Sequence, residues 1–148
     1  MIWAILEPVI RAGETYALPR EMTKAAALAY WTGPDRETFV AVLDGEPVGT
    51  YYLRANQHGG GAHVANCGYM TARHATGRGV ASAMAKHSLA HARARGYTAM
   101  QFNFVIATNV GAIRLWEKLG FATLARLPGA FMHPEHGATD ALLMFRTL

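Results

Sequence analysis

Several short segments of the chain alternate apolar and polar side chains, the pattern of a β-strand with one buried face. In residues 99–106, for example, Met100 and Phe102 flank the polar Gln101. Residues 44–47, Asp-Gly-Glu-Pro, predict a hairpin turn between two such segments. The predicted strands are residues 1–6, 37–43, 48–53, 62–71, 99–106, 121–127 and 141–146.

Three other segments carry apolar or small residues at helical spacing: residues 23–32, 80–95 and 109–119. The first begins at Thr23, a favourable N-cap, and Gly96 ends the second. Because strand, helix and strand follow one another in the centre, the pattern predicts an α+β fold, a mixed sheet with helices on both faces. With 148 residues, 51% of them hydrophobic, we expect a single domain spanning residues 1–148.

The glycine-rich segment 76–81 joins a predicted strand to a predicted helix. Gly77 and Gly79 remove Cβ atoms there, and the free N–H groups of a helix beginning at Val80 carry a positive dipole end. Such a turn can bind a phosphate, to which Arg78 would add charge. The same glycines could also serve only a tight turn, so the segment needs support from elsewhere in the chain.

That support comes about thirty residues later, in residues 109–121. Residues 76–81 and 109–121 together resemble the GCN5-related N-acetyltransferases (GNAT), with Gly79 and Ala81 at the small positions of the phosphate loop and Asn109 opening the second signature. Thr76 stands where the family has Gln or Arg. The resemblance covers residues 48–127 and implies the GNAT fold: a central, mixed, largely antiparallel sheet with a splayed parallel strand pair and flanking helices.

By this resemblance the protein is an N-acetyltransferase that uses acetyl-CoA as co-substrate and no metal. The strand residues Tyr69–Thr71 would offer backbone groups to the pantetheine arm. The residues expected to bind the cofactor are Tyr69, Met70, Thr71, Thr76, Gly77, Arg78, Gly79, Val80, Ala81, Asn109, Ala112 and Trp116.

Three asparagines resemble those of the fungal azetidine-2-carboxylate and pyrroline-5-carboxylate acetyltransferases. By that resemblance Asn66 positions the substrate nitrogen or the acetyl group, Asn103 holds a substrate carboxylate and Asn109 binds the pantetheine arm. Asn66 and Asn103 are therefore the predicted catalytic residues. Asparagine is depleted in strands, which favours a functional reading, although either side chain could instead pair with a loop backbone.

Trp116 occupies the position at which many members of the family have a tyrosine that protonates the departing thiolate. An indole N–H cannot act as an acid at any relevant pH. Because a thiol with a pKa of about 8.5 leaves readily as thiolate, direct attack by an amine in a ternary complex needs no such acid. The sequence identifies no general base; a water near Asn66 or Thr108, or His63, is a candidate.

Charge is distributed unevenly along the chain. All ten acidic residues lie outside the stretch from Pro47 to Trp116, although the net charge is only +4. The centre of the fold is thus suited to an anionic cofactor and to a carboxylated acceptor, such as an amino acid or a cyclic imino acid. Basic residues without interleaved aromatics do not predict a nucleic-acid partner.

The remaining features exclude or leave open other classes of protein. No apolar run is long enough to span a membrane, and one cysteine, Cys67, predicts a cytoplasmic protein without disulfides. His133 and His136 lack the further ligands of a metal site. By analogy with the fold, the apolar last strand, residues 141–145, is a candidate homodimer interface. A peptide or protein acetyltransferase and a non-catalytic acyl-CoA sensor remain alternatives.

Overall fold

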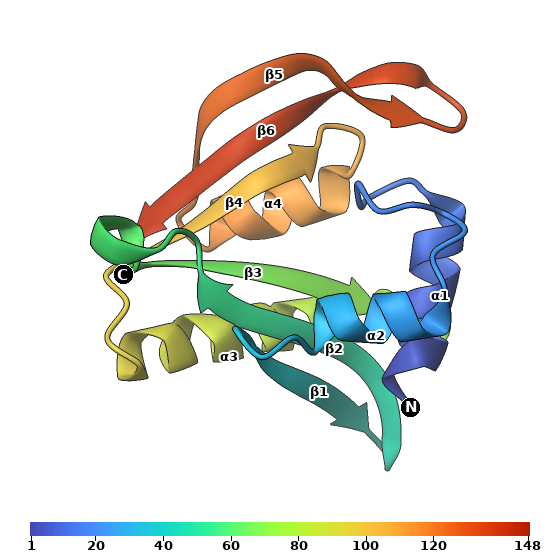
Figure 1. Ribbon diagram of the computed structural model, residues 1–148, viewed down its shortest axis with the longest axis horizontal. Coiled ribbons are helices and arrows are strands. Elements are labelled where there is room, and N and C mark those ends of the chain that lie inside the picture. The colour runs from blue at the N-terminus through green and yellow to red at the C-terminus, as the bar shows by residue number, and fades with distance from the viewer.

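The computed structural model describes residues 1–148 and contains four α-helices and one six-stranded sheet (Figure 1). The helices are α1 (Ile2–Ala12), α2 (Lys24–Trp31), α3 (Val80–Ala94) and α4 (Val110–Lys118). The strands are β1 (Glu37–Leu43), β2 (Glu46–Ala55), β3 (Val64–Thr71), β4 (Ala99–Ile106), β5 (Ala122–His133) and β6 (Gly137–Thr147). Across the sheet their order is β1-β2-β3-β4-β6-β5.

The predicted α+β architecture is confirmed, with one error at the start of the chain. Residues 1–6, predicted as a strand, form the first half of helix α1. Ile2, Ile5, Leu6, Val9 and Ile10 lie at helical spacing and are buried or partly buried. The stripe extends past Pro8, which stays exposed inside the helix. A run of six apolar residues is too short to distinguish a β-strand from the buried face of a helix.

Strands β3 and β4 form the single parallel pair, and they separate soon after it begins. Their register comprises only Val64 with Ala99 and Ala65 with Met100. Every other neighbouring pair is antiparallel. Figure 1 shows β4 rising away from β3 toward the end of the molecule at which α1 lies. The expected splayed parallel pair is therefore present.

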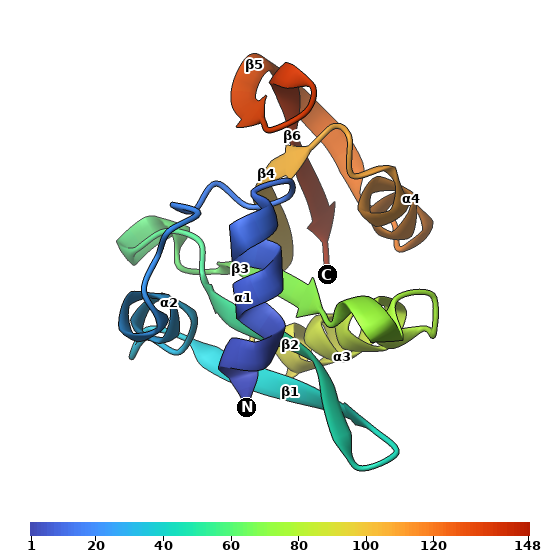
Figure 2. The ribbon, with the colours of Figure 1, turned by 90° about the vertical axis from the view of Figure 1, so that its right-hand side faces the viewer.

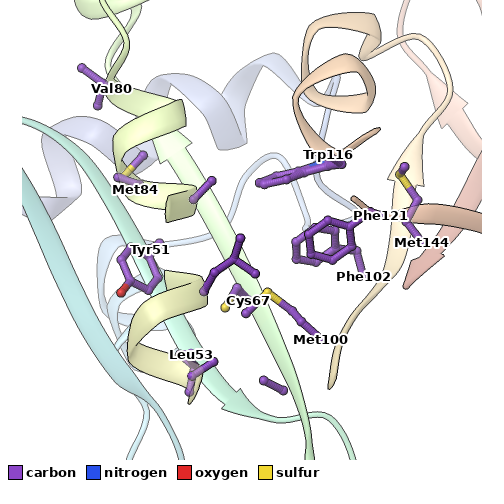
Figure 3. Packing of buried hydrophobic residues seen from close by; sticks show 14 of the residues in the cluster. Tyr51, Leu53, Cys67, Val80, Met84, Met100, Phe102, Trp116, Phe121 and Met144 are labelled. Carbon is purple, nitrogen blue, oxygen red and sulfur yellow. The ribbon is translucent and has the colours of Figure 1, made fainter. Parts of the chain in front are cut away.

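Helices cover both faces of the sheet (Figure 2). On one face, α3 and α4 pack over the larger core, in which Trp116, Phe102 and Phe121 stack closely (Figure 3). On the other face, α1 and α2 enclose a smaller core around Trp31 and Tyr52. Alternate residues of β2 and β3 thus point into different cores, as the two-residue period requires.

The last hairpin differs from its sequence prediction. The predicted strands 121–127 and 141–146 leave residues 128–140 as a connection, but β5 continues to His133 and the turn between β5 and β6 comprises only residues 134–136. The β5–β6 register is irregular between Leu127 and Phe131, where Gly129 has a φ of 59° and donates its N–H to Asp140 Oδ1 at 2.9 Å. Because of this irregularity, the strand accommodates the proline and the glycine and continues beyond them.

Strand β6 lies between β4 and β5, so both of its edges are paired. Edge-to-edge pairing of the last strand across a dimer interface is therefore excluded, because the free edges of the sheet belong to β1 and β5. Packing of this strand across an interface stays a prediction. None of the helices combines the length and the apolar character needed to cross a membrane.

Candidate active site

A cavity of about 640 Å³ opens where β3 and β4 diverge. This volume lies within the range typical of small-molecule sites. Ten of the predicted site residues line it: Asn66, Tyr69, Met70, Thr71, Thr76, Ala81, Asn103, Asn109, Ala112 and Trp116. The other four, Gly77, Arg78, Gly79 and Val80, do not line it but form the turn that leads into α3. The tertiary structure thus gathers the predicted residues around one space.

The glycine turn has the backbone geometry expected of a phosphate loop. Gly77 and Gly79 both have a φ of 81°, which disfavours any side chain, and a Cβ at either would meet no atom within 4 Å. Gly79 is the N-cap of α3, and no side chain caps the helix. The open space and the uncapped N–H groups suit an anion such as a pyrophosphate. Val80 contributes only backbone, since its side chain is buried in the core.

Acidic residues from outside the acid-free stretch approach this turn. Arg78 pairs with Asp44 at 3.6 Å and His74 with Glu46 at 3.1 Å, both acids coming from the β1–β2 hairpin. All four side chains are at least half exposed, so solvent screens these contacts. An incoming phosphate therefore competes with Asp44 for Arg78, a competition that sequence position alone does not reveal.

The backbone of Tyr69 faces the splay, and the structure gives it a partner. The Tyr16 hydroxyl accepts a hydrogen bond from the Tyr69 N–H at 2.6 Å and donates one to the Tyr69 carbonyl at 2.8 Å. These are the backbone groups predicted to meet the pantetheine arm. Burial raises the pKa of the Tyr16 phenol well above its ordinary value, so the hydroxyl stays protonated. A pantetheine amide can use these groups only if Tyr16 moves away.

The side chains of Cys67 and Tyr69 on β3 pack into the larger core. The Tyr69 hydroxyl lies 2.6 Å from Ser88 Oγ, and burial raises its pKa well above the ordinary value. Burial likewise raises the pKa of the Cys67 thiol to about 12. A thiol that stays protonated is a poor nucleophile at neutral pH.

Asn66 and Asn103 both line the cavity but make separate contacts. Asn66 is 6% exposed; its Oδ1 accepts from Arg54 Nε at 3.3 Å and its Nδ2 donates to the Gln101 carbonyl at 2.9 Å. Asn103 is exposed, with its Oδ1 accepting from Gln101 Nε2 and its Nδ2 donating to Asn56 Oδ1 at 2.7 Å. Their catalytic roles remain predictions.

Gly68 lies in β3 two residues after Asn66, and a glycine within a strand often marks a bulge or a close backbone approach. The β2–β3 register is regular there, so no bulge is present. Instead the ring of Tyr52 crosses the strand, and a Cβ at Gly68 would lie 2.5 Å from that ring. The glycine therefore allows Tyr52 to reach the cavity wall.

Helix α4 contributes Asn109, Ala112 and Trp116 to the opposite wall. Asn109 is the N-cap of α4 and makes no side-chain capping bond, which leaves its amide available to a ligand. The Trp116 ring is 7% exposed and packs on Tyr69 and Phe102, with ring centroids 4.9 and 4.5 Å away. Trp116 therefore closes the apolar side of the cavity.

Several cavity residues were absent from the predicted site: Tyr16, Tyr30, Tyr52 and Arg54 among them. Arg54 follows Tyr52 on the same face of β2. Because the neighbouring side chains on that face are buried, the arginine at its end was the feature of the sequence that could have indicated a ligand-binding residue. Tyr16 lies between α1 and α2, where no periodicity predicts a contact with β3.

No carboxylate or imidazole lines the cavity. His63, the candidate base, is exposed and outside the cavity wall. His133 Nδ1 accepts the N–H groups of Glu135 and His136, which gives it a structural role in the β5–β6 turn. Proton transfer within the cavity is thus left to water and hydroxyl groups.

Residues 3–121 match the family model described as the acetyltransferase (GNAT) family. A GCN5-related N-acetyltransferase structure from Kribbella flavida is 40% identical, with a TM-score of 0.92, and the alignment covers 97% of this chain and 88% of that one. The N-acetyltransferase aca1 of Schizosaccharomyces pombe is 28% identical over 151 residues, which is 90% of this chain and 72% of that protein.

The fold recurs in more distant proteins. A GNAT-superfamily phosphinothricin acetyltransferase from Sinorhizobium meliloti, solved in complex with acetyl-CoA, has a TM-score of 0.84 at 20% identity, covering 99% of this chain and 81% of that one. At that identity the likeness shows the fold alone. With the family model spanning most of the chain and a close structural relative over nearly its full length, the protein belongs to the GNAT family of acetyltransferases.

Proposed function

We propose that the protein transfers an acetyl group from acetyl-CoA to the amine of a small acceptor, an amino acid or a cyclic imino acid, by direct attack in a ternary complex. The observation that carries the proposal is the continuity of the cavity, which reaches from Thr76 and Ala81, beside the glycine turn, to the polar side chains of Arg54 and Asn66. A cofactor and an acceptor can therefore meet in one space.

The residues of the glycine turn suit the phosphates of the cofactor. The uncapped first turn of α3 offers N–H groups, and Arg78 adds a positive charge. Asn109 and the open edge of β3 at Tyr69 would hold the amide-rich arm, once Tyr16 has released that edge. Acetyl-CoA supplies the activated acetyl group when it is bound.

On the acceptor side, Asn66 is the residue best placed to orient the reacting groups. It is nearly buried, lines the cavity and is held in one orientation by its two hydrogen bonds. Such preorganisation lowers the entropic cost of bringing an amine to the thioester carbon, for which proximity can contribute on the order of 7–11 kcal/mol.

The chain supplies no strong base, which fits an acceptor that enters as the free amine. The cavity-lining phenols Tyr16 and Tyr69 have pKa values raised by burial, so neither accepts a proton at neutral pH. Trp116 cannot donate one either. Water in the open cavity would take the amine proton, and the thiolate would leave unprotonated.

The relatives support an N-acetyl product, because both the Kribbella flavida structure and the fission-yeast protein are N-acetyltransferases. The fungal origin of the second agrees with the resemblance to the fungal imino-acid acetyltransferases. A protein or peptide acceptor finds less support, since no acidic side chain lines the cavity to bind a cationic tail.

Release of free thiol from acetyl-CoA across a panel of amines tests the proposal. The panel comprises azetidine-2-carboxylate, proline analogues, the common amino acids, polyamines, aminoglycosides and short peptides. Turnover with an amino or imino acid is the expected result. Turnover only with peptides would show that the acceptor is a peptide and not an amino or imino acid. Acetyl-CoA binding with no turnover on any amine would favour a non-catalytic sensor.

A further inference from the structure

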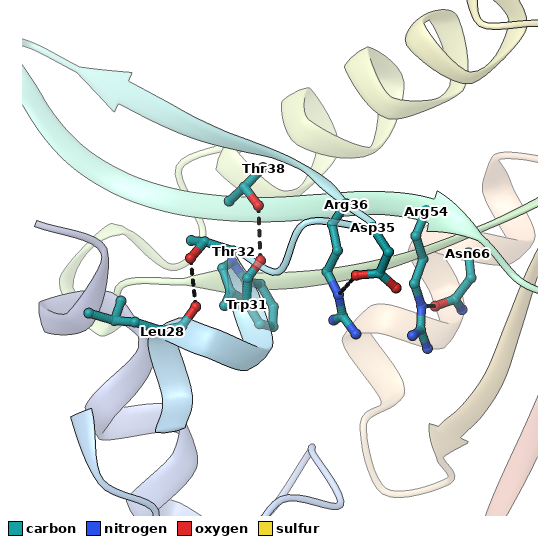
Figure 4. A network of polar contacts seen from close by, with 8 residues as sticks. All are labelled: Leu28, Trp31, Thr32, Asp35, Arg36, Thr38, Arg54 and Asn66. Atoms are coloured by element: carbon teal, nitrogen blue, oxygen red, sulfur yellow. Dashed lines mark hydrogen bonds and ion pairs between the residues drawn. The ribbon is translucent and has the colours of Figure 1, made fainter. Parts of the chain in front are cut away.

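Three polar residues lie in one row across the face of the sheet that α1 and α2 cover (Figure 4). Arg54 on β2 is paired in register with Asn66 on β3. On its other side, the β1–β2 register pairs Glu37 with Leu53, so Arg36 lies one step beyond, next to Arg54. Arg36 directly precedes β1, and its guanidinium and that of Arg54 both lie over the Tyr52 ring, so the two positive charges repel each other unless an anion lies near them.

The protein neutralises this pair only in part, through Asp35 and the ring faces of Tyr30 and Tyr52. Both guanidiniums lie over the ring of Tyr52, with Cζ 4.4 Å from its centroid for Arg36 and 5.8 Å for Arg54. Arg36 has one carboxylate partner, Asp35 at 3.2 Å, and its side chain is 8% exposed. Its Nη1 is buried and has no hydrogen-bond partner. Leaving a buried charged donor unpaired is costly. Arg36 does not itself line the cavity, but its charge adds to the positive potential beside Arg54.

Arg54 is the member of the pair that reaches the cavity. It is the one charged residue among those lining the cavity, and it takes part in no ion pair. Asn66 Oδ1 accepts its Nε–H at 3.3 Å, and no other hydrogen bond engages the guanidinium. The two terminal nitrogens are therefore free to bind a carboxylate in bidentate fashion.

We propose that Arg54, reinforced by the positive charge of Arg36, binds the carboxylate of the acceptor. This inference rests on the proposed function and moves the predicted carboxylate contact away from Asn103. Both polar groups of Asn103 are already used, by Gln101 and Asn56, and an amide carries no charge. Asn66 then has a second task, because it fixes the orientation of the Arg54 guanidinium.

The test compares acids with their carboxamides: L-proline with L-prolinamide, azetidine-2-carboxylate with its amide, and glycine with glycinamide. Each kcat/KM is corrected for the fraction of free amine, since the amides have lower amine pKa values. We expect the wild-type protein to favour the acid by about 100-fold, the effect of a desolvated charge-assisted pair. Equal use of acid and amide would overturn the proposal.

Substitutions identify the residue that causes the preference for the acid over the carboxamide. Arg54→Gln should raise KM for the acid about 100-fold and leave the amide within about threefold, while Arg54→Lys should keep part of the preference because it retains the charge. Arg93→Gln, at an exposed residue of α3, makes the same charge change and should leave the ratio unchanged. Loss of the preference in Asn103→Ala with its retention in Arg54→Gln would assign the carboxylate to Asn103 instead.

Two binding measurements separate this inference from the proposed function. Calorimetric affinity for acetyl-CoA should be unchanged in Arg54→Gln, which also shows that the variant is folded. Ligand-observed NMR of L-proline in the presence of CoA should show binding to the wild type and none to Arg54→Gln. If no amine is acetylated, the proposed function fails, but this NMR result still decides the subsite: equal binding by both proteins would contradict it.

Discussion

The Tyr16 hydroxyl satisfies both backbone groups of Tyr69 at the open edge of β3. Such groups are costly to leave unpaired, at about 1–3 kcal/mol each when buried. The free protein therefore gains stability from a contact that the pantetheine arm would have to replace. At this one residue, stability and cofactor binding oppose each other.

Tyr16→Phe should separate the two effects. Without the hydroxyl, the melting temperature of the free protein should fall, and acetyl-CoA should bind more tightly because nothing has to be displaced. Differential scanning fluorimetry and calorimetry measure the two quantities. If affinity is unchanged or weaker while the protein is destabilised, Tyr16 does not move on binding.

The acid–base character of the cavity gives a second prediction for single residues. Since the lining contains no carboxylate or imidazole, log kcat/KM should rise with pH up to the pKa of the acceptor amine itself. Two acceptors with different amine pKa values should give profiles whose breaks differ by the same amount. A break near pH 7 shared by both acceptors would reveal an enzymatic base.

At the level of elements, the turn before α3 combines two glycines of positive φ with a helix that no side chain caps. Gly79→Ala should cost about 1–2 kcal/mol of stability, because alanine disfavours a φ of 81°. It should also weaken acetyl-CoA binding at least about tenfold, since the methyl group would occupy the open space in front of the helix N-terminus.

Gly96→Ala is the matched control at the other end of α3. Gly96 has a φ of 89° and, as at Gly79, an added Cβ would meet no atom within 4 Å, so the strain is similar. Urea unfolding should report comparable losses for the two variants. Similar acetyl-CoA affinities for both would remove the glycine turn from the binding site.

Elements with a complete local signal were predicted well. Thr23 accepts the Ala26 N–H at 3.1 Å and starts α2 as expected, and β4 has the predicted limits. Residues 1–6 were predicted as a strand because the helical pattern of apolar residues becomes clear only with Val9 and Ile10, which lie beyond that segment. In β5, the Pro-Gly pair indicated a loop, but hydrogen bonding to Asp140 kept the strand continuous. A side chain eleven residues away decided this, and local patterns do not contain it.

For the whole molecule, burial of ionisable groups predicts loss of stability at high pH. The folded Cys67 thiol has a pKa of about 12 against an ordinary 9.0, so above pH 9 the unfolded chain releases a proton that the folded protein keeps. The contribution is complete below pH 9 and declines toward pH 12. Buried tyrosines such as Tyr69 act in the same direction from about pH 10 upward.

Urea unfolding at pH 7.5, 9 and 10 measures this effect. Unfolding free energy should fall by about 1.4 kcal/mol for each pH unit above 9 per such thiol. Cys67→Ala should be less stable overall but should lose less with rising pH. A pH slope in this variant equal to that of the wild type would mean that the thiol is not the source.

The quaternary state remains a prediction. With both edges of β6 paired, edge-to-edge pairing would have to use β1 or β5, and β5 exposes Leu124, Leu127 and Met132. Analytical ultracentrifugation would give the number of chains in solution.

The sequence by itself determined the fold class, the glycine turn, the family and ten of the residues that line the cavity. These follow from local periodicity, from the backbone freedom of glycine and from motif spacing, all of which can be identified in the sequence alone. Only the tertiary structure placed Tyr16 on the edge of β3, Asp44 beside Arg78, and Arg36 next to Arg54. Each of these contacts joins separate segments through strand register or loop packing, which no local pattern in the sequence encodes.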